Sequence, residues 1–328
     1  AQIRQAQAPR GARADIAAKV AECARRRDLF LGARRAAATA NDPTATREQV
    51  EAAIFALRSG WECGSDSLPT HTAAEIDRMT WPETPDWLVE GWWESEACGF
   101  LAAHEKSSKT ILAMGMALSI VNGSPWLGRF AVQQGPVLFI AEEDHIRRVQ
   151  RRIRKLGNAL ALDWRRDDLH FAAQAGANIV NPRGRGRVMT PIRKFKPILL
   201  VLDPFRQLTP GIEEKDSGEV AEVLAWAREV QRENRCGVMI LDHLRKEPTA
   251  GGDQGRVEHQ IRGSGAKGAW RDSFISIKRK AEDSPEHRVR AFHRDGRPLP
   301  TQIVNIVWDD PNEGDLHINS REAEKPIK

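Results

Sequence analysis

The feature that most constrains the fold of this chain is a series of short, uninterrupted apolar runs separated by stretches with helical periodicity. The runs lie at Gly99–Ala103, Pro136–Glu142, Leu169–Ala173, Ile198–Asp203 and Gly237–Asp242. Helices are expected between them at Thr110–Val121, Ile146–Leu156 and Gly218–Glu233. Strands that are apolar throughout are buried on both faces, which is typical of a parallel sheet covered by helices on each side. The sequence therefore predicts an α/β fold with a mostly parallel sheet flanked by helices.

A different pattern follows this core. Strand-like stretches lie at Asp272–Lys278, Arg288–His293 and Gln302–Trp308. They succeed one another directly, with turn residues between them and no helical stretch. We therefore expect C-terminal antiparallel strands that extend the sheet.

The residues before the core predict a separate helical region. Residues 1–60 have helical spacing, with a capping-box pattern at Thr46–Gln49, whereas residues 61–85 are rich in Pro, Ser and Thr and resemble a linker. The expected organisation is a small helical N-terminal region and linker at 1–80, the main domain at 81–312 and a C-terminal tail at 313–328.

Composition sets broad limits on function. The chain of 328 residues carries 50 Lys and Arg against 45 Asp and Glu, so its net charge of +5 gives only weak support for a polyanion partner. No apolar stretch approaches the ~18 residues of a membrane span, and the N-terminus lacks a signal-peptide run. We therefore expect a cytoplasmic protein with no membrane partner.

The four cysteines are Cys23, Cys63, Cys98 and Cys236. Their wide spacing favours reduced packing residues over a zinc site.

A phosphate-binding loop is expected between the first apolar run and the first helix. It comprises Ala103, His104, Glu105, Lys106, Ser107, Ser108, Lys109 and Thr110. The standard pattern is G-x-x-x-x-G-K-[ST]; Lys109 and Thr110 fit it, whereas Ala103 and Ser108 replace the glycines. Lys109 would reach the β- and γ-phosphates of ATP, and the Thr110 hydroxyl would bind Mg²⁺. Because glycine permits a positive φ, serine at 108 is expected to bend the loop or weaken binding.

Two apolar runs end in acidic residues at the sheet edge where ligands bind in α/β folds. The second run ends in three acids, of which Glu143 is assigned to activate the attacking water, with Glu142 as the alternative. Asp144 is expected to cap the following helix. The fourth run ends in Asp203, which fits the acid that supports Mg²⁺ beside Thr110.

The last run ends in His243, which would sense the γ-phosphate or serve a purely structural role. The segment after it, Glu247–Gln260, is rich in Gly, Pro and charge. Two interpretations stay open for this segment: a loop that faces a central channel and contacts DNA, or a disordered surface loop.

Together these residues resemble the RecA-like hexameric helicase superfamily, above all the RepA-type AAA ATPases of plasmids and mobile elements. Pro85–Gly91 looks like the lead-in to the nucleotide loop of that family. Ile261–Ala266 resembles the Arg-Gly-Ser motif after the channel loop, and His293–Gly296 resembles the Arg-x-Gly turn of DnaB-type helicases.

The resemblance implies a RecA-like P-loop NTPase core with ATP and Mg²⁺ bound between the subunits of a ring, expected to be a homo-oligomeric hexamer, on single-stranded DNA. By this resemblance Glu143 is the catalytic carboxylate, Asp203 the Mg²⁺-associated acid and His243 the sensor. Arg294 is the arginine finger for the neighbouring subunit, with Arg271 and Arg262 as weaker candidates.

Two functions remain in competition. The first is an ATP-hydrolysing motor of the DNA helicase type, acting in replication of a mobile element or phage. The second is a regulatory or scaffold module that holds ATP in a degenerate loop with little hydrolysis. A phosphoryl transferase is disfavoured by the long Gly-rich loop, and a Rossmann dehydrogenase by the lack of G-x-G-x-x-G after the first strand.

Overall fold

The computed structural model describes residues 46, 50, 70, 72–79, 86–244, 261, 265–281, 283–293, 300–308 and 316–323. The chain divides into two compact units, Ala1–Trp81 and Pro82–Lys328. In the first unit, helix α3 (Ala73–Arg78) begins at a capping box formed by Thr72 and Glu75, so the stretch expected to be a linker contains a helix. The helices expected over 1–60 lie outside the described residues, apart from a helical Val50 whose N–H donates to the Thr46 carbonyl.

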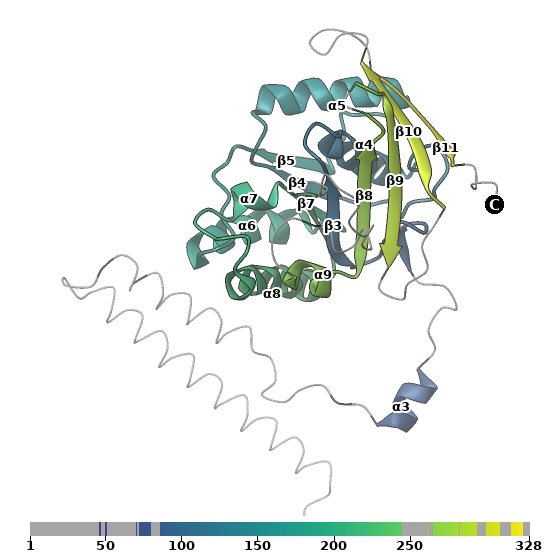
Figure 1. Cartoon of the computed structure of the whole chain (residues 1–328). Helices are drawn as coiled ribbons and strands as arrows, with labels where there is room; N and C mark the ends of the chain where they lie inside the picture. Colours follow the sequence, from purple (N-terminus) through teal and green to yellow (C-terminus); the bar gives the residue numbers. More distant parts are fainter. Residues whose placement is uncertain are drawn as a thin grey trace, which may run out of the picture. The chain divides into compact units, whose positions relative to one another are not determined.

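The second unit is built on a nine-stranded sheet with the order β11-β10-β9-β8-β3-β7-β6-β4-β5 (Figure 1). Its strands are β3 (Cys98–Ala103), β4 (Val137–Ala141), β5 (Leu169–Ala173), β6 (Leu199–Asp203), β7 (Gly237–His243), β8 (Ser273–Arg279), β9 (Glu286–His293), β10 (Gln302–Trp308) and β11 (Leu316–Glu322). Strands β3 to β8 pair in parallel, and β8 to β11 pair antiparallel along the chain. The expected parallel core with an antiparallel extension is confirmed.

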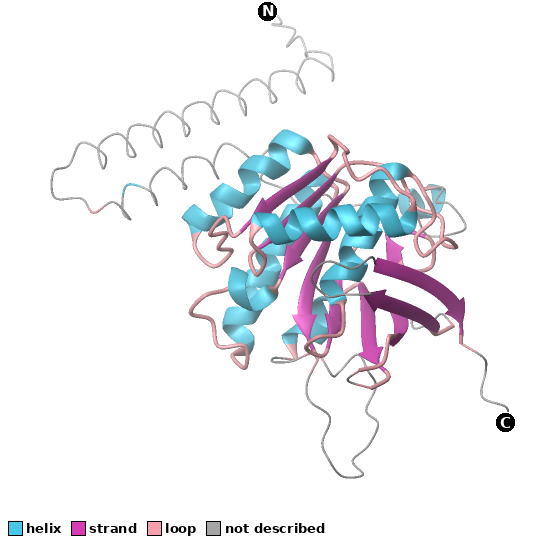
Figure 2. Cartoon of the chain, turned by 90° about the horizontal axis from the view of Figure 1, so that it is seen from above, coloured by secondary structure: helices cyan, strands magenta, loops and turns pink. Residues whose placement is uncertain are grey.

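Helices cover both faces of the parallel strands (Figure 2). They are α4 (Lys109–Asn122), α5 (Ile146–Leu160), α6 (Pro182–Phe195), α7 (Phe205–Leu208), α8 (Ser217–Asn234) and α9 (Ala266–Trp270). Strand β3 shows why two layers are needed: Leu101 and Ala103 pack with α4 and α5, whereas Phe100 and Ala102 pack with α8. Because successive side chains of a strand point to opposite faces, an all-apolar strand requires a cover on each side. In the described part of the chain, no helix has the length and apolar character needed to cross a bilayer.

Two elements of the core were not expected from the sequence. The short hairpin β1 (Trp87–Val89) and β2 (Trp93–Glu94) precedes β3 and is anchored by Trp92, whose ring lies 5.1 Å from that of Trp126. Helix α6 contains two glycines and Pro191, which are unfavourable inside a helix. Its N-cap Asn181, which accepts from the Gly184 N–H, and the proline that follows define where the helix begins.

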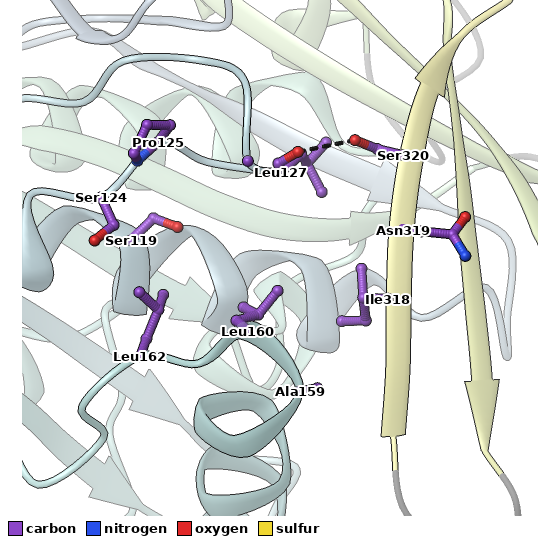
Figure 3. Close-up of a pocket in the computed structure, with 11 residues that line it drawn as sticks. Ser119, Ser124, Pro125, Leu127, Ala159, Leu160, Leu162, Ile318, Asn319 and Ser320 are labelled. Atoms are coloured by element: carbon purple, nitrogen blue, oxygen red, sulfur yellow. Dashed lines mark hydrogen bonds between the residues drawn. The ribbon is translucent and has the colours of Figure 1, made fainter.

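The expected C-terminal tail is wrong for Leu316–Glu322, because this segment forms the edge strand β11. It pairs with β10 from Gln302↔Glu322 to Trp308↔Leu316, and Leu316 is buried. A hollow of about 360 Å³ lies between β11, helices α4 and α5 and the loop after α4 (Figure 3). The Ser320 hydroxyl donates to the Leu127 carbonyl at 2.9 Å across one side of it. The strand was missed because only Leu316 and Ile318 of its seven residues are apolar, which is too short an alternation to predict a strand.

Candidate functional site

The segment between β3 and α4 contains two residues in the left-handed conformation although it lacks glycine. Ser108 is the N-cap of α4 and has φ 57° and ψ 24°, and Lys106 has φ 59°, so both lie in the left-handed region. This conformation costs an L-residue about 1–2 kcal/mol. Ser108 therefore adopts the conformation that glycine normally supplies, and the expectation that serine bends the loop or weakens binding stays a prediction.

The loop leaves donors at the start of α4. The Ser108 side chain makes no cap hydrogen bond, and the first turn of a helix has N–H groups without intrahelical partners. Glu105 and Lys106 are exposed, His104 is half-buried, and Ser107 and Lys109 are buried. A helix N-terminus with such N–H groups and a nearby ammonium group is a favourable place for an anion.

Residues from three strand ends meet beside this loop. The Lys109 Nζ lies 3.4 Å from the His243 Nε2, and Ala103 pairs with His243 in the register of β3 and β7. The Thr110 hydroxyl donates to the Asp203 Oδ2 at 2.8 Å, at the end of β6. Because parallel strands present their carboxyl ends at one edge of the sheet, residues far apart in sequence converge there.

Asp203 has the surroundings of a cation ligand. Its side chain is buried, and burial raises the pKa of its carboxyl to about 6, with Glu143 and Asp144 acting in the same direction and Lys109 and Thr110 opposing them. The Oδ1 atom is buried without a hydrogen-bond partner among the described residues. A buried carboxylate oxygen of this kind, beside a hydroxyl, fits the all-oxygen ligands that Mg²⁺ prefers.

The three acids after β4 have separate environments. Glu142 accepts hydrogen bonds from the N–H groups of Ala175, Gly176 and Ala177, each at 3.0 Å, so this carboxylate holds the loop after β5. Glu143 is exposed, and its charge raises the pKa of Asp203. The geometry therefore favours Glu143 over Glu142 as the residue available to a water molecule.

The expectation that Asp144 caps the following helix is wrong. The N-cap of α5 is His145, whose Nδ1 accepts from the Arg147 N–H at 3.2 Å. Asp144 is 3% exposed and instead accepts from Arg148, at 3.2 Å, and from Arg152. Two guanidinium groups compensate a buried charge more fully than one backbone N–H would, which explains the difference.

A further buried charge lies next to the site, at a position that sequence reasoning missed. Lys267 of α9 is 0% exposed, and its Nζ lies 2.7 Å from Asp242 and 3.4 Å from Glu214. The other oxygen of Asp242 accepts the His243 N–H at 2.7 Å. The ion pair thus fixes the end of β7 next to the proposed sensor. No local pattern around Lys267 distinguishes it from an exposed lysine on a short helix.

The remaining candidates are only partly described. Arg294, Arg262 and the segment Glu247–Gln260 lie outside the described residues. Arg271 is half-buried, and its guanidinium lies 5.1 Å from the centre of the Phe274 ring. Cys98 and Cys236, the two described cysteines, are both buried.

Comparison with solved structures shows which known proteins resemble this fold. A DnaB-like replicative helicase, described with its interactions with primase, is 17% identical; the match covers 91% of this chain and 77% of that one, with a TM-score of 0.57. A solved ATPase domain of another protein is 15% identical, with coverages of 81% and 96% and a TM-score of 0.48. A KaiC-like protein from the archaeon Pyrococcus horikoshii is 14% identical, with coverages of 71% and 94% and a TM-score of 0.47.

Sequence comparison supplies the family. No curated protein matches the chain. The AAA domain family matches residues 66–249, a segment that contains the loop, Glu143, Asp203 and His243. The matched segment is more than half of the chain, and the DnaB-like helicase shares the fold. The chain therefore belongs to the AAA domain family and has the RecA-like fold of that helicase.

Proposed function

We propose that this chain hydrolyses ATP and uses the energy to move on single-stranded DNA as a ring-shaped, helicase-like motor in the replication of a mobile element or phage. The observation that carries the proposal is the convergence of Lys109 with His243 and of Thr110 with Asp203 beside the left-handed loop. A buried ammonium, free helix-start amides and a carboxylate–hydroxyl pair are the parts that phosphoryl transfer requires.

In this proposal the loop amides and Lys109 bind the β- and γ-phosphates. Thr110 and Asp203 would hold Mg²⁺, which would supply positive charge to neutralise the phosphates. Glu143 orients the attacking water and accepts its proton, because it is the exposed carboxylate of the three after β4. Arg294 reaches the nucleotide of a neighbouring subunit and stabilises the charge that develops there.

His243 provides a route for sensing the γ-phosphate. With its proton on Nδ1, the imidazole accepts at Nε2 from the Lys109 ammonium 3.4 Å away. A γ-phosphate would attract the same ammonium, so its arrival and loss change the contact at the end of β7. Through this contact the nucleotide state reaches the segment that follows His243.

The proposal extends to assembly and location. An arginine that acts on the neighbouring subunit's nucleotide completes the site only when subunits assemble, which favours a homo-oligomer, and we propose a hexamer in the cytoplasm. DNA contact through phosphates alone predicts binding that weakens steeply with salt.

The decisive experiment compares Lys109→Ala with Lys194→Ala, which removes the same charge from an exposed position at the end of α6. We expect Lys109→Ala to lower steady-state ATP hydrolysis by about 100-fold or more, because it removes a buried cation from the reacting phosphates. Lys194→Ala should retain the wild-type rate. Full DNA-stimulated hydrolysis by Lys109→Ala would show that the site is wrongly assigned.

One observation supports the alternative of an ATP-binding module with little hydrolysis. Lys106 and Ser108 hold left-handed conformations without glycine, so this loop carries a strain that the standard pattern avoids. Nucleotide affinity and turnover, each measured with and without single-stranded DNA, separate the two functions. Tight binding without turnover under both conditions would favour the module.

A further inference from the structure

The antiparallel extension carries a concentration of exposed cations that the nucleotide site does not use. Along β9, the buried residues His287 and Val289 alternate with the exposed residues Arg288 and Arg290. Strands β9 to β11 lie at the edge of the sheet opposite β5 (Figure 1). Arg288 and Arg290 therefore lie on a face of β9 that none of the described helices covers.

Strand register aligns further cations with them. Arg288 pairs with Ile303 of β10, which in turn pairs with Arg321 of β11. Residues in one such row lie on the same face of the sheet, about 5 Å apart from strand to strand. Ile303, at the centre of the row, is only 4% exposed although it belongs to this face. Long arginine stems cover apolar surface while their charged ends stay in water, and Ile303 lies between two arginines in the strand register.

These side chains surround a hollow of about 460 Å³, which we name the basic hollow. It is lined by Lys280, Glu286, Arg288, Arg290, Thr301, Ile303, Arg321 and Ala323. Among the described lining residues, four cations thus face one carboxylate, and that carboxylate lies 3.5 Å from Lys280. Arg290 donates from Nε to the Thr301 hydroxyl at 3.1 Å, which leaves the outer nitrogens of its guanidinium group for another acceptor. Among the described residues, Arg288 and Arg321 have no carboxylate partner.

We propose that the basic hollow binds the phosphodiester backbone of single-stranded DNA, as a second contact surface outside the nucleotide site. Guanidinium groups bind phosphate oxygens in a bidentate manner, and a nucleic acid supplies several such groups in a row. None of the described residues that line the hollow is aromatic, so bases have nothing to stack on there and the contact carries no sequence preference. The same lining, with its surplus of like charge, makes a protein partner a poor fit. The choice of DNA as the ligand rests on the proposed function.

The test measures binding of a fluorescently labelled single-stranded oligonucleotide as a function of salt, without nucleotide. Each phosphate contact contributes about 0.7 to the slope of log affinity against log salt. Replacing Arg288, Arg290 and Arg321 together by glutamine should therefore reduce the slope by about 2. Glutamine retains part of the aliphatic stem over Ile303, and a matched set of Arg→Lys replacements should restore the slope because it restores the charge.

A control with equal loss of charge comes from α5, where Arg147, Arg151 and Arg154 are exposed. Their joint replacement by glutamine should leave the slope within about 0.5 of wild type, because single charges far from the strand are screened. A wild-type slope in the β-sheet variant, or an equal fall in the control, would overturn the proposal. So would a change in native mass of the β-sheet variant without a change in slope, since the face would then contact another copy of the chain.

The outcome of this test can be distinguished from the outcome of the test of the motor function. If wild type binds the oligonucleotide and loses slope in the β-sheet variant, yet shows no DNA-stimulated ATP hydrolysis, then the basic hollow is a DNA contact and the motor function is wrong. If ATP hydrolysis responds to DNA but the slope does not respond to the β-sheet variant, the motor function stands and the basic hollow is not a DNA contact.

Discussion

The parallel half of the sheet and its antiparallel extension differ in where their charged side chains lie. Within the strands of the parallel half, charged side chains are few and lie at strand ends, as with the buried Asp203 beside Thr110 and the buried Asp242 beside Lys267. In the extension, the cations are exposed and spread across a face, as with Arg288 and Arg290. The first arrangement gives a point-like site of fixed geometry, and the second gives a surface.

The difference follows from how the strands are buried. Every residue of β6 is buried, so its one charged side chain, Asp203, lies where the strand ends. Strand β9 alternates between buried and exposed residues, so each second side chain reaches solvent along its whole length. Burial on two faces therefore concentrates polar groups at one edge, whereas burial on one face distributes them. A phosphate group fits the first arrangement and a polymer of phosphates fits the second.

The two regions meet at β8, which is parallel to β3 and antiparallel to β9. Gly99 of β3 lies opposite Ser273 of β8, and a Cβ atom at Gly99 would be 1.8 Å from the Ser273 carbonyl oxygen. That contact is possible only if the two strands separate. The lack of a side chain at Gly99 therefore allows β8, the first strand of the extension, to pair with β3 of the core.

The largest effect is expected from Gly99→Ala, which should lower the free energy of unfolding by about 3 kcal/mol or more because backbone atoms must move. The same substitution at Gly186 of α6 is the control, since a Cβ there meets nothing within 4 Å. Gly186→Ala should stabilise the chain by about 1 kcal/mol through helix propensity. Denaturant unfolding of the three proteins measures both changes. Equal effects would mean that the joint between the regions tolerates a side chain.

A smaller effect is expected at the loop that begins the nucleotide site. Ser108→Gly should raise the free energy of unfolding by about 1 kcal/mol, because glycine adopts the left-handed conformation without steric cost. Ser108→Ala keeps the side-chain clash and loses no cap hydrogen bond, so its stability should stay near that of wild type. The comparison requires unfolding curves without nucleotide. If alanine stabilises the chain as much as glycine does, the backbone strain at Ser108 does not lower its stability.

The sequence predicted the strands whose residues are mostly apolar. Continuous apolar runs identified β3 to β7, and the rule that parallel strands end at one edge predicted that Asp203 and His243 lie together beside the phosphate loop. Elements with weaker local patterns were missed. Helix α6 contains residues that break helices, and β11 has only two apolar residues, Leu316 and Ile318.

The missed parts of the site depend on contacts between distant residues. The prediction that Asp144 caps α5 was wrong because Arg148 and Arg152 lie one and two turns further along this helix and donate to the carboxylate. The buried pair of Lys267 and Asp242 depends on how α9 packs against α8 and places Lys267 near the end of β7, and no spacing in the sequence encodes that packing. Local patterns thus located the phosphate loop and the strand-end acids, whereas tertiary packing decided which acids were available.

The smallest expected effect tests the buried face of the extension, which contrasts with its basic outer face. His287 is 1% exposed between Arg279 of β8 and Val304 of β10, and burial lowers the pKa of its imidazole below the usual 6.5. The pKa of the folded state is lower than that of the unfolded state, so the unfolded chain takes up the proton first as the pH falls below 6.5. The stability contributed by a neutral His287 is therefore present above pH 6.5 and is lost as the pH falls through the pKa of the folded state.

His287→Gln removes this titration and keeps a donor for the Pro285 carbonyl, which the Nδ1 reaches at 2.8 Å in wild type. Urea unfolding at pH 7.5 and pH 5.0 should show a larger loss of stability on acidification for wild type than for the variant. An equal loss in both would mean that the imidazole is protonated as readily in the folded chain as in the unfolded one. The inner face of the extension would then be open to water, and the contrast between its two faces would reduce to a difference in charge alone.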